Sequence, residues 1–265
     1  MITRLGVCGW PVAHSRSPQM HNAALHTLGL DDWRYQHLPI PPHLFKETVR
    51  ALPALRFKGV NVTIPHKEQA FELATHTTDT AKAIGAANTL TFNPDGSIHA
   101  DNTDAPGFLH CLNTSIYGKT ALVLGAGGSS RAILYALKQA GVSELRLWNR
   151  SPERAQALAA EFQATVSTEP ADIIVNCTAI GLKPGEDPFK ALPIRADDLS
   201  AGRTVVDMVY REGGTFLLNS ARDRGADVVD GLEILVAQGA ASLERWTGRT
   251  APDAAMREAV ADIAR

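Results

Sequence analysis

Hydrophobic and polar positions between residues 1 and 110 alternate between strand-like and helix-like patterns. Short apolar or alternating runs predict strands at residues 5–9, 33–40, 59–64, 88–92 and 97–100. Helical spacing predicts helices at residues 17–28, 42–52 and from 67 onward. Ser17 followed by Pro18 is typical of a helix cap and the first helical position, and Asn93-Pro94-Asp95-Gly96 has the composition of a hairpin turn. We therefore expect an α/β domain in this half.

The second half carries uninterrupted apolar runs. They predict strands at residues 120–124, 172–176 and 204–207, and residues 144–148 are predicted to form a further strand. Helices are predicted at 130–139, 152–162, 233–246 and 252–264. Continuous apolar strands that alternate with helices predict a parallel sheet covered on both faces. We expect an α/β chain in three parts. These are an N-terminal α/β domain (residues 1–103), a Rossmann-type doubly wound domain (104–236) and C-terminal helices that return to the first domain (237–265). The boundary is expected near residues 104–119, where 111–118 form a polar patch.

Length and composition fit this division. The chain has 265 residues, 45% of them hydrophobic, which is enough for two cores. No apolar run approaches the roughly 18 residues of a membrane-spanning helix. The N-terminus leads directly into the first predicted strand, so we expect no export signal.

Charge, cysteine and histidine usage exclude several classes of protein. The net charge is −2, and positions 1–110 hold nine basic and nine acidic side chains, so no basic excess indicates a nucleic-acid partner. Cys8, Cys111 and Cys177 are far apart and form no C-x-x-C pair, which favours a reducing cytoplasm over a disulfide framework. All nine histidines lie within positions 1–110, but without metal-ligand spacing, so we expect no metal.

A glycine-rich turn predicts a phosphate site. Gly125-Ala126-Gly127-Gly128-Ser129-Ser130 follows an apolar strand and opens a helix. The glycines allow a tight turn and close approach of the backbone to a pyrophosphate, while the helix N-terminus offers free N–H groups. Ser130 stands where the usual fingerprint has a third glycine, and the alternative is an ordinary glycine turn.

The next strand tip indicates which dinucleotide would bind. An NAD site places Asp or Glu there, about 20 residues after the glycine turn. Here the segment is Asn149-Arg150-Ser151-Pro152-Glu153-Arg154, with no acid at the tip. Two guanidinium groups suit a 2′-phosphate, so NADP is favoured. The alternative is that Arg150 and Arg154 are solvated residues at a helix start.

Polar clusters in the first half point to a ligand. Ser15 and Ser17 stand near a helix N-terminus, where hydroxyl groups can bind a carboxylate, although a plain helix cap is the alternative. Strand alternation places Asn61 and Thr63 on one face, directly before Lys67. Two further clusters are rich in amides and carboxylates, although such residues also form ordinary turns. They are Asn88-Thr89 and Asp101-Asn102-Thr103-Asp104.

Taken together, these motifs resemble the shikimate dehydrogenase family over essentially the whole chain. The matching segments occur in the family's order. They are residues 9–18 (Gly-Trp-Pro-Val-Ala-His-Ser-Arg-Ser-Pro), residues 61–67 (Asn-Val-Thr-Ile-Pro-His-Lys), Asn88-Thr89, residues 101–104, the glycine turn and residues 230–239 (Asp-Gly-Leu-Glu-Ile-Leu-Val-Ala-Gln-Gly). Several motifs at suitable spacings make this resemblance far more specific than a lone glycine turn.

The resemblance implies a function and a set of site residues. Family members reduce 3-dehydroshikimate to shikimate with NADPH, on the route to chorismate and aromatic amino acids, so the first domain would bind substrate and the second NADP. Lys67 and Asp104 would form the catalytic pair. The implied substrate-binding residues are Ser15, Ser17, Asn61, Thr63, Lys67, Asn88, Asp104, Tyr210 and Gln238. The implied cofactor contacts are Asp79, Gly125, Ala126, Gly127, Gly128, Ser129, Asn149, Arg150, Ser151, Arg154, Thr178, Met208 and Gly231.

The residue types suit this chemistry. A substrate with hydroxyl groups and a carboxylate needs neutral hydrogen-bond partners. Hydride transfer to a ketone builds negative charge on its oxygen, which the Lys67 ammonium would stabilise and protonate, with Asp104 orienting it. Three segments depart from the family pattern. They are Arg16, Ala105-Pro106 before Gly107, and Arg211-Glu212-Gly213-Gly214 after Tyr210.

Two alternative functions follow from the sequence. One is a quinate/shikimate dehydrogenase with broader cofactor use, against which the arginines near the strand tip argue. The other is a binding module without catalysis, against which the presence of both Lys67 and Asp104 argues. The sequence leaves open whether the chain is a monomer or a homodimer.

Overall fold

The computed structural model describes residues 1–183 and 185–261. The chain forms two compact units, each described by itself below. Unit 1 comprises Met1–Gly107 and Leu235–Val260, and unit 2 comprises Phe108–Ile234. Unit 1 therefore includes residues 104–107 and 235–236, which the sequence analysis groups with the second domain.

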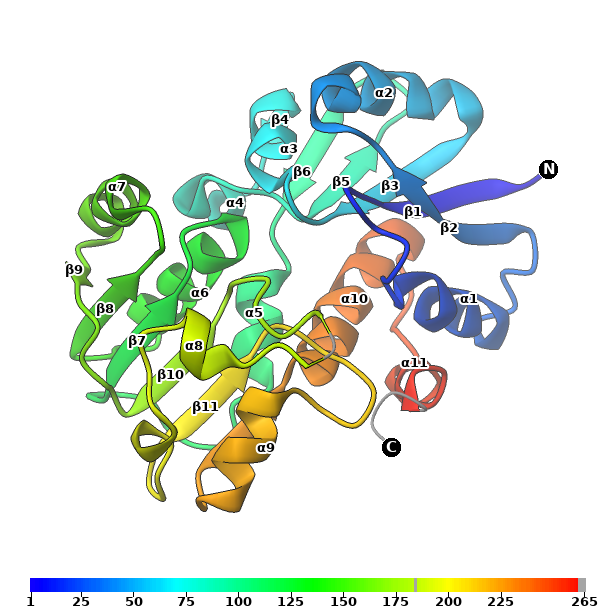
Figure 1. Cartoon of the computed structure of the whole chain (residues 1–265). Helices are drawn as coiled ribbons and strands as arrows, with labels where there is room; N and C mark the ends of the chain where they lie inside the picture. Colours follow the sequence, from blue (N-terminus) through cyan, green and yellow to red (C-terminus); the bar gives the residue numbers. More distant parts are fainter. Residues whose placement is uncertain (184, 262–265) are drawn as a thin grey trace. The chain divides into compact units, whose positions relative to one another are not determined.

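Unit 1 is built on a mixed six-stranded sheet in the order β2-β1-β3-β5-β6-β4 (Figure 1). The strands are β1 (Thr3–Gly9), β2 (Trp33–Pro39), β3 (Phe57–Val62), β4 (His76–Thr77), β5 (Thr89–Phe92) and β6 (Ile98–Asp101). β1, β2 and β3 are parallel, whereas β5 is antiparallel to both β3 and β6. The predicted hairpin is confirmed, since Phe92 pairs with Ile98 across its turn. β4 has only two residues, both exposed, and therefore has no apolar pattern that could predict it.

Seven helices of the described residues belong wholly or partly to unit 1. They are α1 (Ser17–Thr27), α2 (Phe45–Ala51), α3 (Lys67–Leu73), α4 (Asp79–Ile84), α5 (Asp104–His110), α10 (Gly231–Thr247) and α11 (Asp253–Glu258). Short 3-10 turns, Pro42–Leu44 and Leu52–Leu55, flank α2. α10 begins in unit 2 and belongs to unit 1 from Leu235 onward.

Several predicted helix boundaries differ from the structure. Ser17 is the first residue of α1 rather than its cap, and Arg16, which occupies the cap position, makes no side-chain capping bond. Residues 104–110, where the domain boundary is expected to begin, form α5. The predicted helix at 252–264 ends at Glu258 as α11, and its last positions, 262–264, lie outside the described residues.

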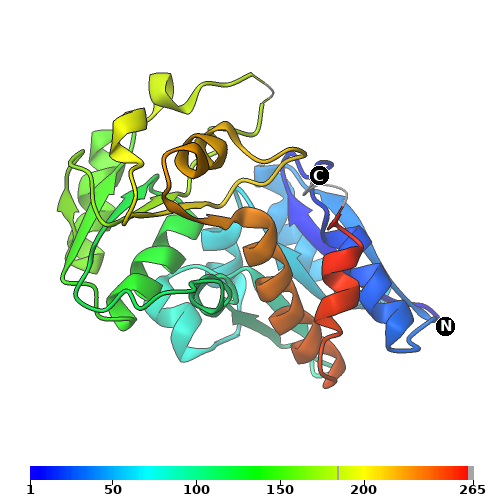
Figure 2. The ribbon, with the colours of Figure 1, turned by 90° about the horizontal axis from the view of Figure 1, so that it is seen from below.

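Side chains attach the helices of unit 1 to its sheet. Asn22 of α1 exchanges two hydrogen bonds of 2.9 Å with the backbone of Tyr35 in β2. Trp246 of α10 donates from Nε1 to the Leu90 carbonyl at 3.1 Å, and a Cβ at Gly59 would overlap the indole. Glycine at position 59 therefore lets α10 lie close to β3. α11 packs beside α1, as Figure 2 shows.

Unit 2 contains an all-parallel six-stranded sheet in the order β12-β11-β10-β7-β8-β9. Its strands are β7 (Thr120–Leu124), β8 (Glu144–Trp148), β9 (Thr165–Val166), β10 (Ile173–Asn176), β11 (Thr204–Asp207) and β12 (Asp227–Asp230). This is the strand order of a dinucleotide-binding Rossmann fold, in which ligands bind at the carboxyl ends of the strands where the order reverses, here between β7 and β10. The predicted Rossmann-type fold is confirmed.

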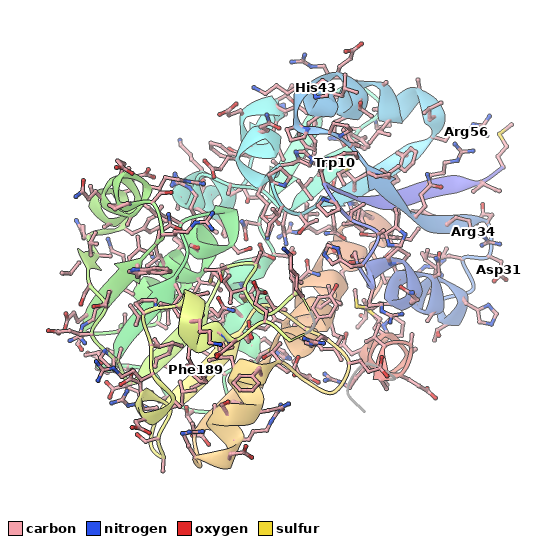
Figure 3. All side chains as sticks on the ribbon, in the orientation of Figure 1. Trp10, Asp31, Arg34, His43, Arg56 and Phe189 are labelled. Carbon is pink, nitrogen blue, oxygen red and sulfur yellow. The ribbon has the colours of Figure 1, made fainter. Side chains whose placement is uncertain are left out.

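The sheet of unit 2 is buried on both faces, as its apolar strands predict. Leu122, Leu124 and Val205 pack with Leu217 and Leu218 of one helix in a single apolar cluster. The helices are α6 (Gly128–Gln139), α7 (Pro152–Phe162), α8 (Pro188–Ala191) and α9 (Phe216–Asp223), with a 3-10 turn at Ala196–Asp198. Phe189 of α8, labelled in Figure 3, meets Phe216 of α9 edge to face, with ring centroids 5.9 Å apart.

The described residues contain neither a membrane-spanning helix nor a cluster of metal ligands. No helix there is both long and apolar enough to span a bilayer. No group of three or more His, Cys, Asp or Glu side chains within residues 1–183 and 185–261 is arranged to hold a metal ion.

Candidate active site

The sheet of unit 1 brings the predicted polar clusters to one edge. Asn61, near the carboxyl end of β3, pairs with Thr89 at the amino end of antiparallel β5, and Thr89 pairs with Asp101 at the carboxyl end of β6. α3 begins at Lys67 and α5 at Asp104, each shortly after its strand ends. The alternation of strand directions therefore gathers segments that are far apart in the sequence.

A buried ion pair stands at the centre of this edge. Lys67 Nζ lies 2.6 Å from Asp104 Oδ2. Lys67 is only 8% exposed and Asp104 only 5%. Because buried charges are costly unless they are paired and hydrogen-bonded, such a pair indicates a functional role more strongly than a stabilising one. The two residues expected to form the catalytic pair are thus in direct contact.

Asn88 links the ion pair to its surroundings. Its Nδ2 donates to Asp104 Oδ1 at 2.8 Å, to Thr103 Oγ1 at 2.9 Å and to Gln238 Oε1 at 3.1 Å. Its Oδ1 accepts from the Thr103 backbone N–H at 2.8 Å and from the Thr89 hydroxyl at 2.9 Å. The orientation of the Asn88 amide is therefore determined by its neighbours, and Asp104 has both carboxylate oxygens engaged.

Asn61 lies beside this cluster with its amide oxygen also engaged. Asn61 Oδ1 accepts from the Tyr35 hydroxyl at 2.8 Å and the Ser242 hydroxyl at 3.4 Å. Its Nδ2 donates weakly, at 3.2 Å, to the Asn88 carbonyl oxygen. Thr63 directly follows β3, and its backbone N–H donates to the Cys8 carbonyl at 2.8 Å, which fixes the first residue after the strand.

The two predicted carboxylate-binding serines are adjacent. Ser15 Oγ lies 3.2 Å from Ser17 Oγ, and both residues are buried. His37 Nε2 donates to the Ser15 carbonyl at 2.9 Å, which ties this loop to β2. Since Ser17 is the first residue of α1 rather than its cap, its role as a plain helix cap is not supported by the structure.

Gln238 reaches the same cluster through the close packing of α10 against α5. Besides accepting from Asn88, Gln238 donates from Nε2 to the Leu235 carbonyl at 2.8 Å. A Cβ added to Gly107 would lie 2.9 Å from Gln238 N and 3.1 Å from its Cα. Gly107 therefore allows α10 to approach closely enough for Gln238 to reach Asn88.

Sequence reasoning missed several members of this network. Thr103, Tyr35 and Ser242 hold Asn88 and Asn61 in place, although only Thr103 lies within a motif. His21 is fully buried, stacks on Tyr35 with ring centroids 4.2 Å apart, and has its pKa lowered to about 3 by burial. The His21 imidazole is therefore uncharged at neutral pH and packs as an aromatic ring.

In unit 2 the glycine turn has the geometry that a pyrophosphate requires. Gly125 has φ +112°, a conformation that favours glycine, and its Cβ would meet the Cys177 backbone at 3.2 Å. A Cβ at Gly127 would meet no atom within 4 Å, so the space over the turn is open. α6 begins at Gly128, two residues before the predicted start, because Ser130 Oγ accepts from the Gly127 N–H at 3.3 Å and closes the first turn.

The tip of β8 carries the residues expected to select NADP. Arg154 Nη2 donates to the Ala126 carbonyl at 3.0 Å, so its guanidinium lies against the glycine turn. Asn149 donates from Nδ2 to the Ser151 carbonyl at 3.1 Å, and Arg150 is exposed just before α7. With Arg150 and Arg154 near the strand tip and no carboxylate at residues 149–152, the donor set fits a nucleotide that carries an additional phosphate.

The remaining predicted site residues occupy both units. Thr178 follows β10, Met208 and Tyr210 follow β11, and Gly231 opens α10, all in unit 2. A Cβ at Gly231 would lie 2.7 Å from the Met208 carbonyl oxygen, so this close approach requires glycine. Asp79 is the exposed first residue of α4 and belongs to unit 1, whereas the other predicted cofactor residues belong to unit 2.

A Rossmann-type unit with an open glycine turn, in one chain with a buried lysine–aspartate pair among neutral polar groups, defines a dinucleotide-dependent dehydrogenase. Comparison with known proteins specifies the family. Residues 7–90 match the shikimate dehydrogenase substrate binding domain, residues 110–179 match shikimate / quinate 5-dehydrogenase, and residues 231–261 match the shikimate 5′-dehydrogenase C-terminal domain.

Relatives match over almost their whole length. The shikimate dehydrogenase (NADP(+)) of Dinoroseobacter shibae is 44% identical, with 92% of this chain and 91% of that protein covered. The crystal structure of shikimate dehydrogenase from Aquifex aeolicus is 38% identical, with a TM-score of 0.90 and coverage of 98% and 97%. Shikimate 5-dehydrogenase from Thermus thermophilus, in complex with NADP(H) and shikimate, is 39% identical, with a TM-score of 0.86 and coverage of 97% and 98%. This chain belongs to the shikimate dehydrogenase family.

Proposed function

We propose that this protein catalyses the reversible, NADPH-dependent reduction of 3-dehydroshikimate to shikimate, on the route to chorismate and aromatic amino acids. The relatives are named shikimate dehydrogenase (NADP(+)), and one similar structure contains NADP(H) and shikimate. The observation that carries the proposal for this chain is the buried contact of 2.6 Å between Lys67 and Asp104.

The ion pair supplies the proton chemistry. NADPH, when bound, supplies the hydride. Reduction of a ketone places negative charge on its oxygen, which the Lys67 ammonium stabilises and to which it delivers a proton. Asp104 holds this ammonium through one oxygen while Asn88 holds the other oxygen. In the oxidation of shikimate the same lysine, once neutral, takes the hydroxyl proton back.

The surroundings of the pair supply recognition. We assign the adjacent hydroxyl groups of Ser15 and Ser17 to the substrate carboxylate. Asn61, Thr63, Asn88 and the other assigned polar groups take the ring hydroxyls. These other groups are Asp104, Gln238 and Tyr210. A substrate that lacks one hydroxyl would leave a buried polar group unpaired, which gives strong discrimination.

We assign NADP binding to unit 2 and substrate binding to unit 1, to which Tyr210 of unit 2 is added by family position alone. The open glycine turn and the N-terminus of α6 would hold the pyrophosphate, while Arg150 and Arg154 would bind the 2′-phosphate. Thr178, Met208 and Gly231 would contact the rest of the cofactor. Asp79 stays an assignment by family position alone.

We also propose that the enzyme acts in the cytoplasm on small molecules rather than on nucleic acid. The net charge of −2 offers no electrostatic attraction for a phosphate backbone. Cys8 is a thiol buried in the core of unit 1, where burial raises its pKa, and a buried thiol of this kind suits a reducing compartment.

A direct assay tests the proposed function. Purified protein with NADPH and saturating 3-dehydroshikimate should show loss of NADPH absorbance, and the reverse reaction should consume shikimate with NADP+. Quinate and NAD+ are the comparison substrates, and we expect shikimate with NADP+ to be preferred. Absence of any NADPH oxidation would overturn the proposal, while equal rates with quinate and NAD+ would replace it with a quinate/shikimate dehydrogenase of broad cofactor use.

A further inference from the structure

Two buried polar side chains end neighbouring strands of unit 2 and take no part in the proposed chemistry. Asn176 is the last residue of β10 and Asp207 the last residue of β11, and the two are paired in register. Both are fully buried. They lie at the carboxyl edge of the parallel sheet, the edge at which a Rossmann-type fold binds its dinucleotide.

The Asn176 amide organises the loop that follows its own strand. Its Oδ1 accepts from the Thr178 backbone N–H at 3.1 Å and from the Thr178 hydroxyl at 2.7 Å. Its Nδ2 donates to the Ile180 carbonyl at 3.0 Å and to Asp207 Oδ1 at 2.9 Å. Both hydrogens and both lone-pair positions of the amide are thus used within the protein.

Asp207 extends the network to the neighbouring loop. Besides Asn176, its Oδ1 accepts from the Val209 backbone N–H at 3.0 Å. The Met208 backbone N–H donates to the Asn176 carbonyl oxygen at 2.9 Å. Hydrogen bonds therefore hold the backbone of Met208 and of Val209, the two residues that follow Asp207. The Thr215 side chain lies beside the Asp207 carboxyl, and burial raises the pKa of this carboxyl to about 7.

We propose that Asn176 and Asp207 are positioning residues for the cofactor, which hold Thr178 and Met208 in the arrangement that binds NADP. A fully buried carboxyl is costly, so its presence indicates a requirement other than stability. The hydrogen-bond acceptor Oδ1 performs this role, and the negative charge does not. This inference rests on the proposed assignment of Thr178 and Met208 to the cofactor.

Equilibrium binding of NADPH to the full-length protein, measured by fluorescence titration, tests the proposal without relying on turnover. We expect Asn176→Ala and Asp207→Ala to weaken NADPH binding by about tenfold or more, because Thr178 and Met208 would no longer be held where they contact the cofactor. Asp207→Asn keeps an acceptor toward Asn176 and Val209 and should stay within about threefold of the parent. Shikimate binding, measured by calorimetry, should be unchanged in all three variants.

Asp172→Ala is the matched control. Asp172 precedes β10 at the opposite end of the same sheet, and its Oδ2 accepts from the Thr120 backbone N–H at 2.8 Å and the Thr120 hydroxyl at 2.9 Å. This change therefore also removes carboxylate hydrogen bonds between neighbouring strands, but at the amino edge of the sheet. It should leave NADPH affinity unchanged.

The outcomes separate the inference from the function on which it rests. If the parent protein binds no NADPH, the proposed function fails. If the parent binds NADPH and both alanine variants bind it equally well, the positioning role alone is refuted. If Asp207→Asn loses as much affinity as Asp207→Ala, the charge is what matters and the role assigned to Oδ1 is wrong. If Asn176→Ala does not fold, Asp207→Ala provides the decisive comparison, because this change removes a buried carboxyl that is costly to the fold.

Discussion

The close contact between Gly107 and Gln238 allows a quantitative prediction for Gly107→Ala. The new Cβ would lie 2.9 Å from Gln238 N, 3.0 Å from its Cβ and 3.1 Å from its Cα. These are mostly backbone atoms of a packed helix, so they cannot turn aside as a flexible side chain can. Reaching an ordinary contact of 3.4 Å requires α5 and α10 to separate by about 0.5 Å, since packed atoms resist closer approach. Because Asp104 at the start of α5 is held by both Lys67 and Asn88, we expect α10 to move.

The expected cost follows from this displacement. Overpacking costs about 1–3 kcal/mol, and alanine recovers up to about 1 kcal/mol through its better helix propensity, so we expect a net destabilisation of roughly 0–3 kcal/mol. The Asn88–Gln238 bond, now 3.1 Å, would lengthen to about 3.6 Å and cease to be a hydrogen bond. Losing the placement of Gln238 should then weaken shikimate binding by about 1–2 kcal/mol, a factor of roughly 5–30.

Calorimetric titration with shikimate, fluorescence titration with NADPH and urea unfolding together test this prediction. Shikimate affinity should fall while NADPH affinity holds. The control is Gly239→Ala, whose Cβ would overlap the terminal methyl of Met20, a flexible group, so it should lower stability and leave Gln238 in place. Unchanged shikimate affinity in Gly107→Ala, or an equal loss in Gly239→Ala, would refute the reasoning.

Three further predictions concern catalysis, cofactor choice and pH. Lys67→Ala should lower kcat by about 10²–10⁴-fold with little change in shikimate affinity, because the ammonium acts mainly in the transition state; a lost affinity with kcat retained would contradict its role. Arg150→Ala combined with Arg154→Ala should raise the Kd of NADPH by about 10–100-fold and leave that of NADH unchanged, in parallel fluorescence titrations. Burial raises the pKa of Asp207 to about 7, so the folded protein keeps a proton that the unfolded chain releases above about pH 4, and stability falls as pH rises through this window. Between about pH 5 and about pH 8 the free energy of unfolding, measured with urea, should therefore fall by roughly 3 kcal/mol more in the parent than in Asp207→Asn. A difference between the two proteins that does not change with pH would show that Asp207 does not titrate in this range.

The central strands of unit 2 could be predicted because they are buried on both faces. The run 120–124 is apolar after Thr120 and forms β7 with the predicted bounds, and the turn after it needs glycine where Gly125 has positive φ. Elements without such a pattern were not predictable. β4 and β9 have two residues each, all exposed, and α8 has four, too few for a helical period. At Ser17 the sequence pattern could not distinguish a helix cap from a first helical residue. Only the hydrogen bonds in the structure distinguish them.

The sequence by itself determined which chemical groups are present and, through local periodicity, the strands and helices that carry them. Lys67, Asp104 and the glycine turn were recognisable as motifs because each is formed by neighbours in the chain. Only the tertiary structure decided which groups meet. Asn88 and Gln238 are 150 positions apart and lie within hydrogen-bonding distance because Gly107 lets two helices approach. Asn176 and Asp207, 31 positions apart, meet because their strands are paired in register. Such contacts depend on strand order and helix spacing, which burial of the whole core sets and which no local pattern records.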